Sequence, residues 1–148
     1  MALYMIVERF PAENLDAIFK LFEENIGYTY SVAWLDVMAK GKKLGRSILM
    51  VGEDATLKDL RGTKYEKEPL KLHNSGKLFV PMNLPKMVMS NLSMRLFNIA
   101  FYHKTRKKRK TSIVHYDPYY YPLDGIHHWN RIYGKRGFVQ YQFVLPPE

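Results

Sequence analysis

Clusters of hydrophobic positions, some of them alternating with polar ones, predict five short strands along the chain. Each run is rich in β-branched or aromatic residues, and most are bounded by glycine, proline or asparagine, which is typical of strands. The predicted strands are Leu3–Phe10, Tyr28–Trp34, Ser47–Val51, Ile113–Tyr116 and Phe138–Val144. Because the runs are short and separated by turns, we expect them to form one mostly antiparallel sheet.

Three stretches between these strands carry signals of helices. In the first, apolar residues recur at the spacing i, i+3, i+4 and i+7, with charged residues on the other face. These apolar residues are Leu15, Ile18, Phe19 and Phe22. The second helix is predicted from Pro85 to Tyr102, since proline is well tolerated in a first turn. The third is predicted over Gly125–Tyr133, with Asp124 as its cap.

Length and composition place these elements in one domain. The chain has 148 residues, of which 47% are hydrophobic and 25% charged, as in ordinary soluble proteins. The predicted fold is α+β, with a mostly antiparallel sheet and the helices packed on one face. The N-terminus lacks the pattern of a signal peptide, and the most apolar later window, Met82–Tyr102, contains Lys86 and Arg95. We therefore expect no bilayer-spanning segment. The expected location is the cytoplasm, with peripheral association with a membrane as the open alternative.

The positive charge of the chain is concentrated in one segment. The net charge is +9, and six of the seven residues of Lys104–Lys110 are cationic. Such a surplus attracts anionic partners. The segment is compatible with a solvated loop, a contact with an anionic membrane, or a nucleic-acid patch. A basic binding module for nucleic acid or an anionic membrane is thus one hypothesis for the whole chain, although no nucleic-acid-binding module surrounds the segment.

The residues present do not form a complete catalytic or metal-binding set. The chain contains no cysteine, which excludes disulfides and thiolate ligands. The adjacent histidines His127 and His128 point to different sides of any helix or strand, and the other histidines are isolated, so no metal site is expected. Neither Gly-x-Ser-x-Gly nor Gly-x-Gly-x-x-Gly occurs. No catalytic or cofactor-binding residue is predicted.

The C-terminal third offers binding chemistry instead. In the last predicted strand, alternation places Gln140 and Gln142 on one face, where two amides are suited to sugar hydroxyls. A solvent-facing edge strand is the alternative. Trp129 and Arg131 offer a stacking surface and a bidentate donor for phosphate. The alternative there is a Trp packed in the core, with Asn130 and Arg131 solvated.

Several motifs together resemble one family of enzymes. They are Tyr28–Asp36, Gly41–Ser47, Tyr120–Asp124, Trp129–Arg131, Tyr133–Gly134 and Val139–Val144. These motifs resemble the substrate (cap) domain of FAD-linked oxidases of the vanillyl-alcohol-oxidase type, in the family that includes the aldonolactone and decaprenylphosphoryl-ribose oxidases. The similarity covers most of the chain and is weakest from Glu53 to Gly76.

The resemblance implies a set of residues on the substrate side of a flavin pocket. These are Trp34, Tyr120, Leu123, Trp129, Asn130, Arg131, Gln140 and Gln142. In such oxidases FAD accepts a hydride from a carbinol carbon of a sugar, and the cap domain holds the sugar in place. The implied substrate is a sugar or a polyprenyl-phosphate sugar. The resemblance also implies that Lys104–Lys110 lies near the mouth of the pocket and close to a membrane.

The chain also departs from the family pattern. Nothing in it resembles the FAD-binding domain. In members of the family, a region after these motifs carries a further lysine of the pocket, and residues 1–148 contain no counterpart of that region. We therefore expect residues 1–148 to be a cap-domain fragment that neither binds FAD nor acts alone. Its expected partners are the substrate and the flavin domain of a longer parent chain. A homodimer through the uncovered sheet edge is a further possibility.

Overall fold

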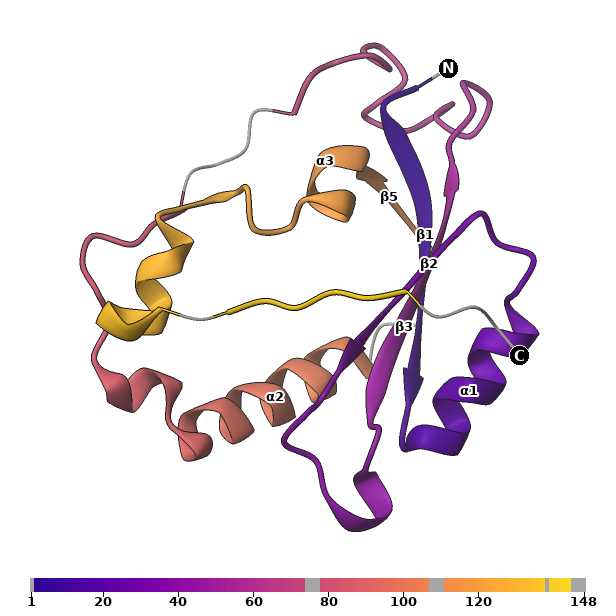
Figure 1. Ribbon diagram of the computed structural model, residues 1–148. Coiled ribbons are helices and arrows are strands. Elements are labelled where there is room, and N and C mark those ends of the chain that lie inside the picture. The colour runs from indigo at the N-terminus through magenta and orange to yellow at the C-terminus, as the bar shows by residue number, and fades with distance from the viewer. Residues whose placement is uncertain (1, 74–77, 107–110, 138, 145–148) are drawn as a thin grey trace.

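A four-stranded antiparallel sheet forms the centre of the computed structural model, which describes residues 2–73, 78–106, 111–137 and 139–144 (Figure 1). The strands lie in the order β2–β3–β1–β5. They are β1 (Tyr4–Ala12), β2 (Tyr30–Leu35), β3 (Ser47–Asp54) and β5 (Ser112–His115). Two short parallel strands, β4 (Leu78–Phe79) and β6 (Ile126–His127), form a second sheet. This arrangement confirms the predicted α+β class and four of the five predicted strands.

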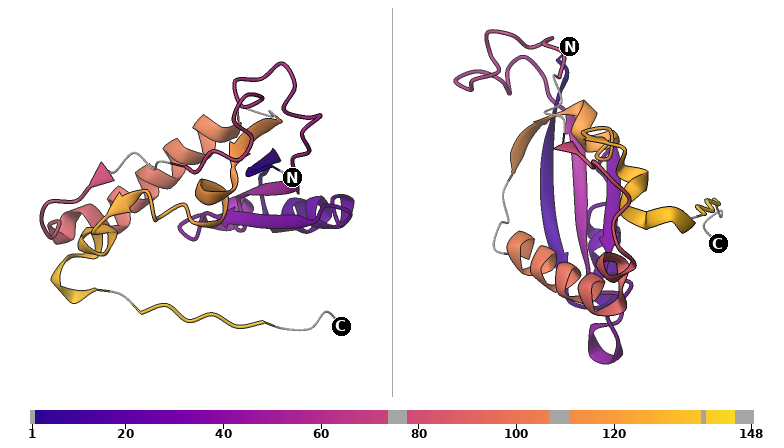
Figure 2. Two further views of the ribbon diagram at one scale, coloured as in Figure 1. Left: turned by 90° about the horizontal axis from the view of Figure 1, so that it is seen from above. Right: turned by 90° about the vertical axis from the view of Figure 1, so that its left-hand side faces the viewer.

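The helices cover both faces of the main sheet (Figure 2). α1 (Leu15–Glu24) packs on one face, and α2 (Asn91–Arg106) and α3 (Tyr116–Tyr120) lie on the other. Adjacent residues of β3 show the division, because Leu49 packs with α1 whereas Met50 faces α2. The structure thus differs from the expectation that all helices share one face. The cause is that β3 has apolar residues at successive positions, which buries both sides of the strand.

α1 forms as its periodicity predicts. The side chain of Asn14 accepts a hydrogen bond of 2.9 Å from the backbone N of Ala17, which satisfies one of the unpaired N–H groups of the first turn. Ile18 is buried against the sheet. The helix ends at Glu24, and the next residue, Asn25, caps it.

The second predicted helix is divided in two. Ser90 has an extended backbone, with φ −71° and ψ 155°, and separates the 3-10 helix η2 (Lys86–Met89) from α2. The hydroxyl of Ser90 accepts a 3.3 Å hydrogen bond from the backbone N of Ser93. A serine in this position is a favoured N-cap. The single helix predicted from Pro85 is therefore interrupted at Ser90, where α2 begins.

Two predictions for the C-terminal third are wrong. Gly125–Tyr133 is not one helix: a turn and β6 come first, and the 3-10 helix η3 (Trp129–Arg136) follows His128, whose φ is 56°. A left-handed residue interrupts a right-handed helix. Residues 139–144 form no strand, and Phe138 lies outside the described residues. Val139 and Val144 are 96% and 91% exposed, and a β-rich sequence remains unpaired when no neighbouring strand packs against it.

A buried polar cluster joins β2, β3 and α2. The guanidinium of Arg46 forms an ion pair with Asp36, and the amide of Asn98 donates a 2.8 Å hydrogen bond to the same carboxylate. The ring of Tyr102 lies 4.8 Å from the guanidinium carbon. All four residues are buried. Because a buried charge is tolerated only when it is paired, this cluster holds the C-terminal half of α2 against the sheet.

We predict that Asp36→Ala lowers the free energy of unfolding by about 3–5 kcal/mol, because it leaves the Arg46 guanidinium buried without its counter-charge. Urea unfolding measures this loss. The matched control is Glu24→Ala, which removes an exposed pair with Lys20 and should cost about 0.5 kcal/mol or less. Equal losses in the two variants would contradict the role given to Asp36.

The same cluster makes part of the stability depend on pH. Burial alone would raise the pKa of Asp36, but hydrogen bonds from Arg46, Asn98 and the backbone N of Met38 lower that pKa below its ordinary value of 3.8. The stabilisation is therefore complete above pH 3.8 and is lost as the pH falls through the lower, folded-state pKa. We expect the stability difference between the wild type and Asp36→Ala to be constant near neutral pH and to shrink in acid. Urea titrations at successive pH values test this, and an undiminished difference at low pH would refute it.

Candidate functional site

A cavity of about 420 Å³ lies between the main sheet, α2 and α3. Its floor consists of strand residues that alternate onto the face opposite α1, and its walls come from the two helices and the turn after α3. These residues are Arg9, Trp34, Ile48, Met50, Val114, Phe101, Thr105, Pro118, Tyr119 and Pro122. Most are apolar or aromatic, and the volume is that of a small-molecule pocket.

Trp34, a predicted site residue, lies in this cavity. It is on β2 opposite Ile48 of β3. Its ring centroid is 4.8 Å from that of Phe101 on α2, with an interplanar angle of 51°. Strand β2 thus supplies the Trp ring and α2 supplies its aromatic partner, so the position of α2 determines the shape of this wall.

Tyr119 of α3 reaches the sheet at a position without a side chain. A Cβ placed on Gly52 of β3 would lie 3.0 Å from the Tyr119 hydroxyl oxygen and 3.1 Å from the Cε of Met5. The hydroxyl is buried and has no hydrogen-bond partner in the part of the chain that the structure describes. Burial raises the pKa of Tyr119, although the positive charge of Arg9 opposes the shift. The absence of a side chain at Gly52 therefore sets how closely α3 approaches the sheet.

Tyr120, the next residue, packs on the same face of the sheet. Its ring lies 5.5 Å from that of Tyr30 on β2, at 86°, which is the favourable edge-to-face geometry. Partial burial, followed by a hydrogen bond with Tyr30 and nearby charges, raises the pKa of the Tyr120 phenol well above its ordinary value. At neutral pH Tyr120 is thus a hydrogen-bond donor and not a base.

Arg9 is a cavity residue that the sequence analysis did not single out. It lies on β1 opposite Met50, is half-buried, and donates a 2.8 Å hydrogen bond from Nη1 to the hydroxyl of Ser112 on β5. The signal that could have found it is an arginine in a predicted strand. That signal is weak without the structure, because such a residue usually faces solvent.

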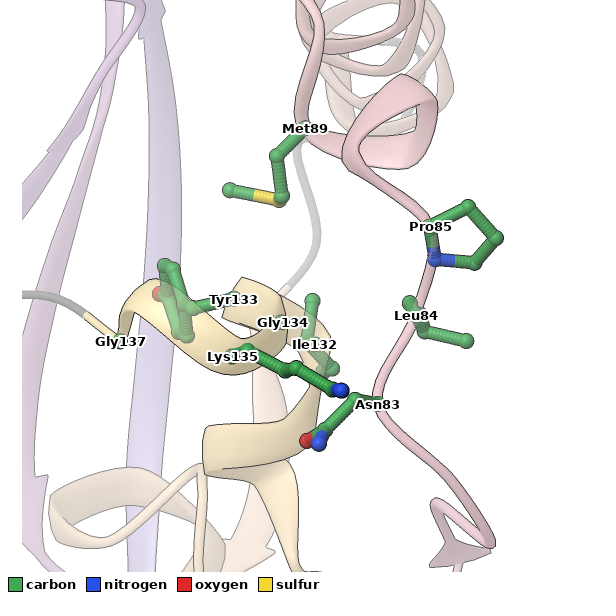
Figure 3. Close-up of a pocket in the computed structure, with 9 residues that line it drawn as sticks. All are labelled: Asn83, Leu84, Pro85, Met89, Ile132, Tyr133, Gly134, Lys135 and Gly137. Atoms are coloured by element: carbon green, nitrogen blue, oxygen red, sulfur yellow. The ribbon is translucent and has the colours of Figure 1, made fainter.

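The predicted residues of η3 lie elsewhere. The Arg131 guanidinium donates hydrogen bonds of 3.1 and 2.9 Å to the carbonyls of Val80 and Pro81, and the Trp129 ring lies 6.1 Å from that of Tyr133. A second cavity of about 560 Å³ separates η3 from the segment that begins at residue 83. Figure 3 shows the Lys135 side chain of this cavity extending toward Asn83. The two hydrogen bonds of Arg131 therefore link η3 to residues 80–81, which lie just before that segment in the chain.

The eight predicted site residues therefore occupy three regions. Trp34 and Tyr120 lie on the face of the sheet opposite α1, and Leu123 follows in the exposed turn after α3. Trp129, Asn130 and Arg131 belong to η3. Gln140 and Gln142 lie in the exposed segment 139–144. The structure of this chain alone does not bring the three regions into one site, and the common substrate pocket stays a prediction.

Other kinds of site receive no support from the described residues. Among them, no three His, Cys, Asp or Glu side chains are grouped as a metal would require. None of the described helices combines the length and apolar character needed to cross a bilayer. Most of the basic segment Lys104–Lys110 lies outside the described residues, so its predicted contacts stay predictions.

Comparison with known proteins supports the class that the motifs indicate. No family model matches the chain. The resemblance to FAD-linked oxidases is nevertheless confirmed by a curated relative. Decaprenylphosphoryl-beta-D-ribose oxidase of Mycolicibacterium smegmatis is 37% identical to this chain over 121 residues, which is 82% of the chain and 26% of the relative. The chain thus spans about a quarter of the length of that oxidase. The comparison gives no support to the hypothesis of a basic binding module.

The contact between Gly52 and Tyr119 can be tested by a double-mutant cycle. Gly52→Val should lower the free energy of unfolding by about 1–3 kcal/mol, because the added side chain displaces Tyr119. In a Tyr119→Ala background the same substitution should cost clearly less. The control is Gly27→Val, since a Cβ at Gly27 meets nothing within 4 Å. Additive effects of Gly52→Val and Tyr119→Ala would contradict the contact.

Proposed function

We propose that residues 1–148 form the substrate-binding part of an FAD-dependent oxidoreductase that oxidises a hydroxyl of a polyprenyl-phosphate sugar. The observation that carries this proposal is the 37% identity over 82% of the chain to decaprenylphosphoryl-beta-D-ribose oxidase. The aromatic cavity on the sheet supports it, because sugar rings and prenyl groups both pack well on aromatic faces. The function is therefore binding and orientation of the substrate.

The described side chains suit particular roles in this function. Trp34 offers an apolar wall beside Phe101, and the phenol oxygen of Tyr120, whose ring packs edge-to-face on Tyr30, offers an acceptor for a sugar hydroxyl. In our proposal Gln140 and Gln142 add amide contacts to sugar hydroxyls once the segment 139–144 packs against the rest of the oxidase. None of these groups is a base or a nucleophile at neutral pH, so these residues position the sugar and do not react with it.

The described residues do not fit FAD. Their closest counterpart of a phosphate-binding loop is the glycine-containing turn Gly41–Gly45. This turn is closed by α1, since a Cβ on Gly45 would lie only 2.6 Å from the Cα of Leu15. We therefore propose that a flavin domain outside residues 1–148 holds FAD, and that this domain and the cap domain enclose the substrate together.

The proposal is tested with the full-length protein that contains these residues. We expect it to purify with bound flavin, and farnesyl-phosphoryl-ribose to bleach the flavin absorbance under anaerobic conditions. Trp34→Ala should lower kcat/KM by about tenfold or more through lost substrate packing. Phe19→Ala is the control, because Phe19 is an exposed residue of α1 on the opposite face, and it should leave kcat/KM unchanged. A full-length protein that binds no flavin, or whose flavin is not reduced, would contradict the proposal.

A further inference from the structure

Arg9 differs from the other arginines whose contacts the structure shows. Arg46 is buried and paired with a carboxylate, and Arg131 donates to two backbone carbonyls. Arg9 is half-buried in an apolar cavity, and its hydrogen bond goes to a neutral hydroxyl. Among the described residues no carboxylate lies within ion-pairing distance of Arg9, and no acidic residue lines its cavity.

A partly desolvated charge of this kind is costly unless an anion accompanies it. The usual solution within a fold is a carboxylate, as Asp36 provides for Arg46. The groups that line the cavity together with Arg9 include the side chains of Trp34, Met50 and Tyr119, none of which carries a negative charge at neutral pH. The missing counter-charge points to a ligand that supplies it.

The strands hold the Arg9 guanidinium in place through a single side-chain hydrogen bond, which uses few of its N–H donors. The hydroxyl of Ser112 accepts the 2.8 Å hydrogen bond from Arg9 and itself donates to the carbonyl of Val7 at 3.4 Å. Arg9 is also fixed through its backbone in the central strand β1. A guanidinium has five N–H donors in a planar fork, so one anchoring bond orients it and leaves the others for a ligand.

We propose that Arg9 binds the phosphate group of the substrate, with the aromatic and aliphatic walls of the cavity receiving the adjoining apolar group. The identity of the ligand as a prenyl phosphate ester rests on the proposed function. Arginine matches phosphate oxygens in a bidentate geometry and forms charge-assisted hydrogen bonds with them. A cavity of about 420 Å³ has space for the phosphate together with part of its organic substituent.

The test uses the full chain and two probes that share their apolar part, farnesyl phosphate and farnesol. Isothermal titration calorimetry should show that the wild type binds farnesyl phosphate at least about tenfold more tightly than farnesol, as one charge-assisted contact provides. Arg9→Gln should abolish this preference and leave farnesol binding unchanged. Arg61→Gln is the matched control, because it removes the same charge from an exposed arginine outside the cavity, and it should behave as the wild type.

Two further variants separate a binding role from a folding role. Arg9→Lys keeps the charge but loses the fork and should retain part of the preference. Ser112→Ala leaves the guanidinium without its anchoring hydrogen bond but keeps its charge, and should weaken farnesyl phosphate binding about threefold to tenfold. Both are compared with the wild type by thermal denaturation. A preference that survives in Arg9→Gln, or a wild type that binds both probes equally, would overturn the inference.

The outcome is distinguishable from failure of the proposed function. Arg9-dependent binding of farnesyl phosphate, combined with a full-length protein whose flavin is not reduced, would overturn the oxidase proposal and leave the anion site standing. An active oxidase in which Arg9→Gln does not change KM for the lipid-linked sugar would overturn the anion site alone.

Discussion

The buried ion pair between Asp36 and Arg46 is the interaction on which the arrangement of the other elements depends. It joins the end of β2 to the start of β3, and Asn98 extends it to α2. The apolar core alone does not determine the position of α2, because hydrophobic contacts are non-directional. Hydrogen bonds to one carboxylate are directional. They place the helix so that Phe101 stands beside Trp34, which forms one wall of the cavity.

The two faces of the sheet have different structural roles. The face under α1 is a conventional core, where Ile18 packs with Leu49 and Val51. The opposite face is only partly covered by α2 and α3 and contains the cavity with Arg9. A sheet that is well packed on one side provides a rigid base for groups on the other. This division explains how the chain can hold a half-buried arginine without losing its core.

Most of the fold could be predicted from the sequence because its signals are local. The helical spacing around Ile18 and the β-rich runs determine elements whatever their neighbours are. The side on which each helix packs depends on tertiary contacts, and the apolar residues at successive positions of β3 were compatible with either side. The segment 139–144 has the alternation of a strand, but pairing requires a partner that the sequence cannot show.

The candidate site was predictable only in part. Trp34 and Tyr120 were identified by family resemblance, and both lie on the face of the sheet opposite α1. The resemblance says nothing of distances, and so it could not show that Arg131 is engaged with backbone carbonyls. Arg9 was missed because the feature that distinguishes it is that no described acidic residue lies within ion-pairing distance of it, and this depends on residues far away in the sequence.

The close approach of Tyr119 to Gly52 has a consequence for how related sequences can diverge. The two residues share one space, so their sizes are linked although they are far apart along the chain. A relative with a larger residue at the position of Gly52 must have a smaller one at the position of Tyr119, or carry α3 higher above the sheet. Joint variation of these two positions among homologues would therefore record the depth of the cavity.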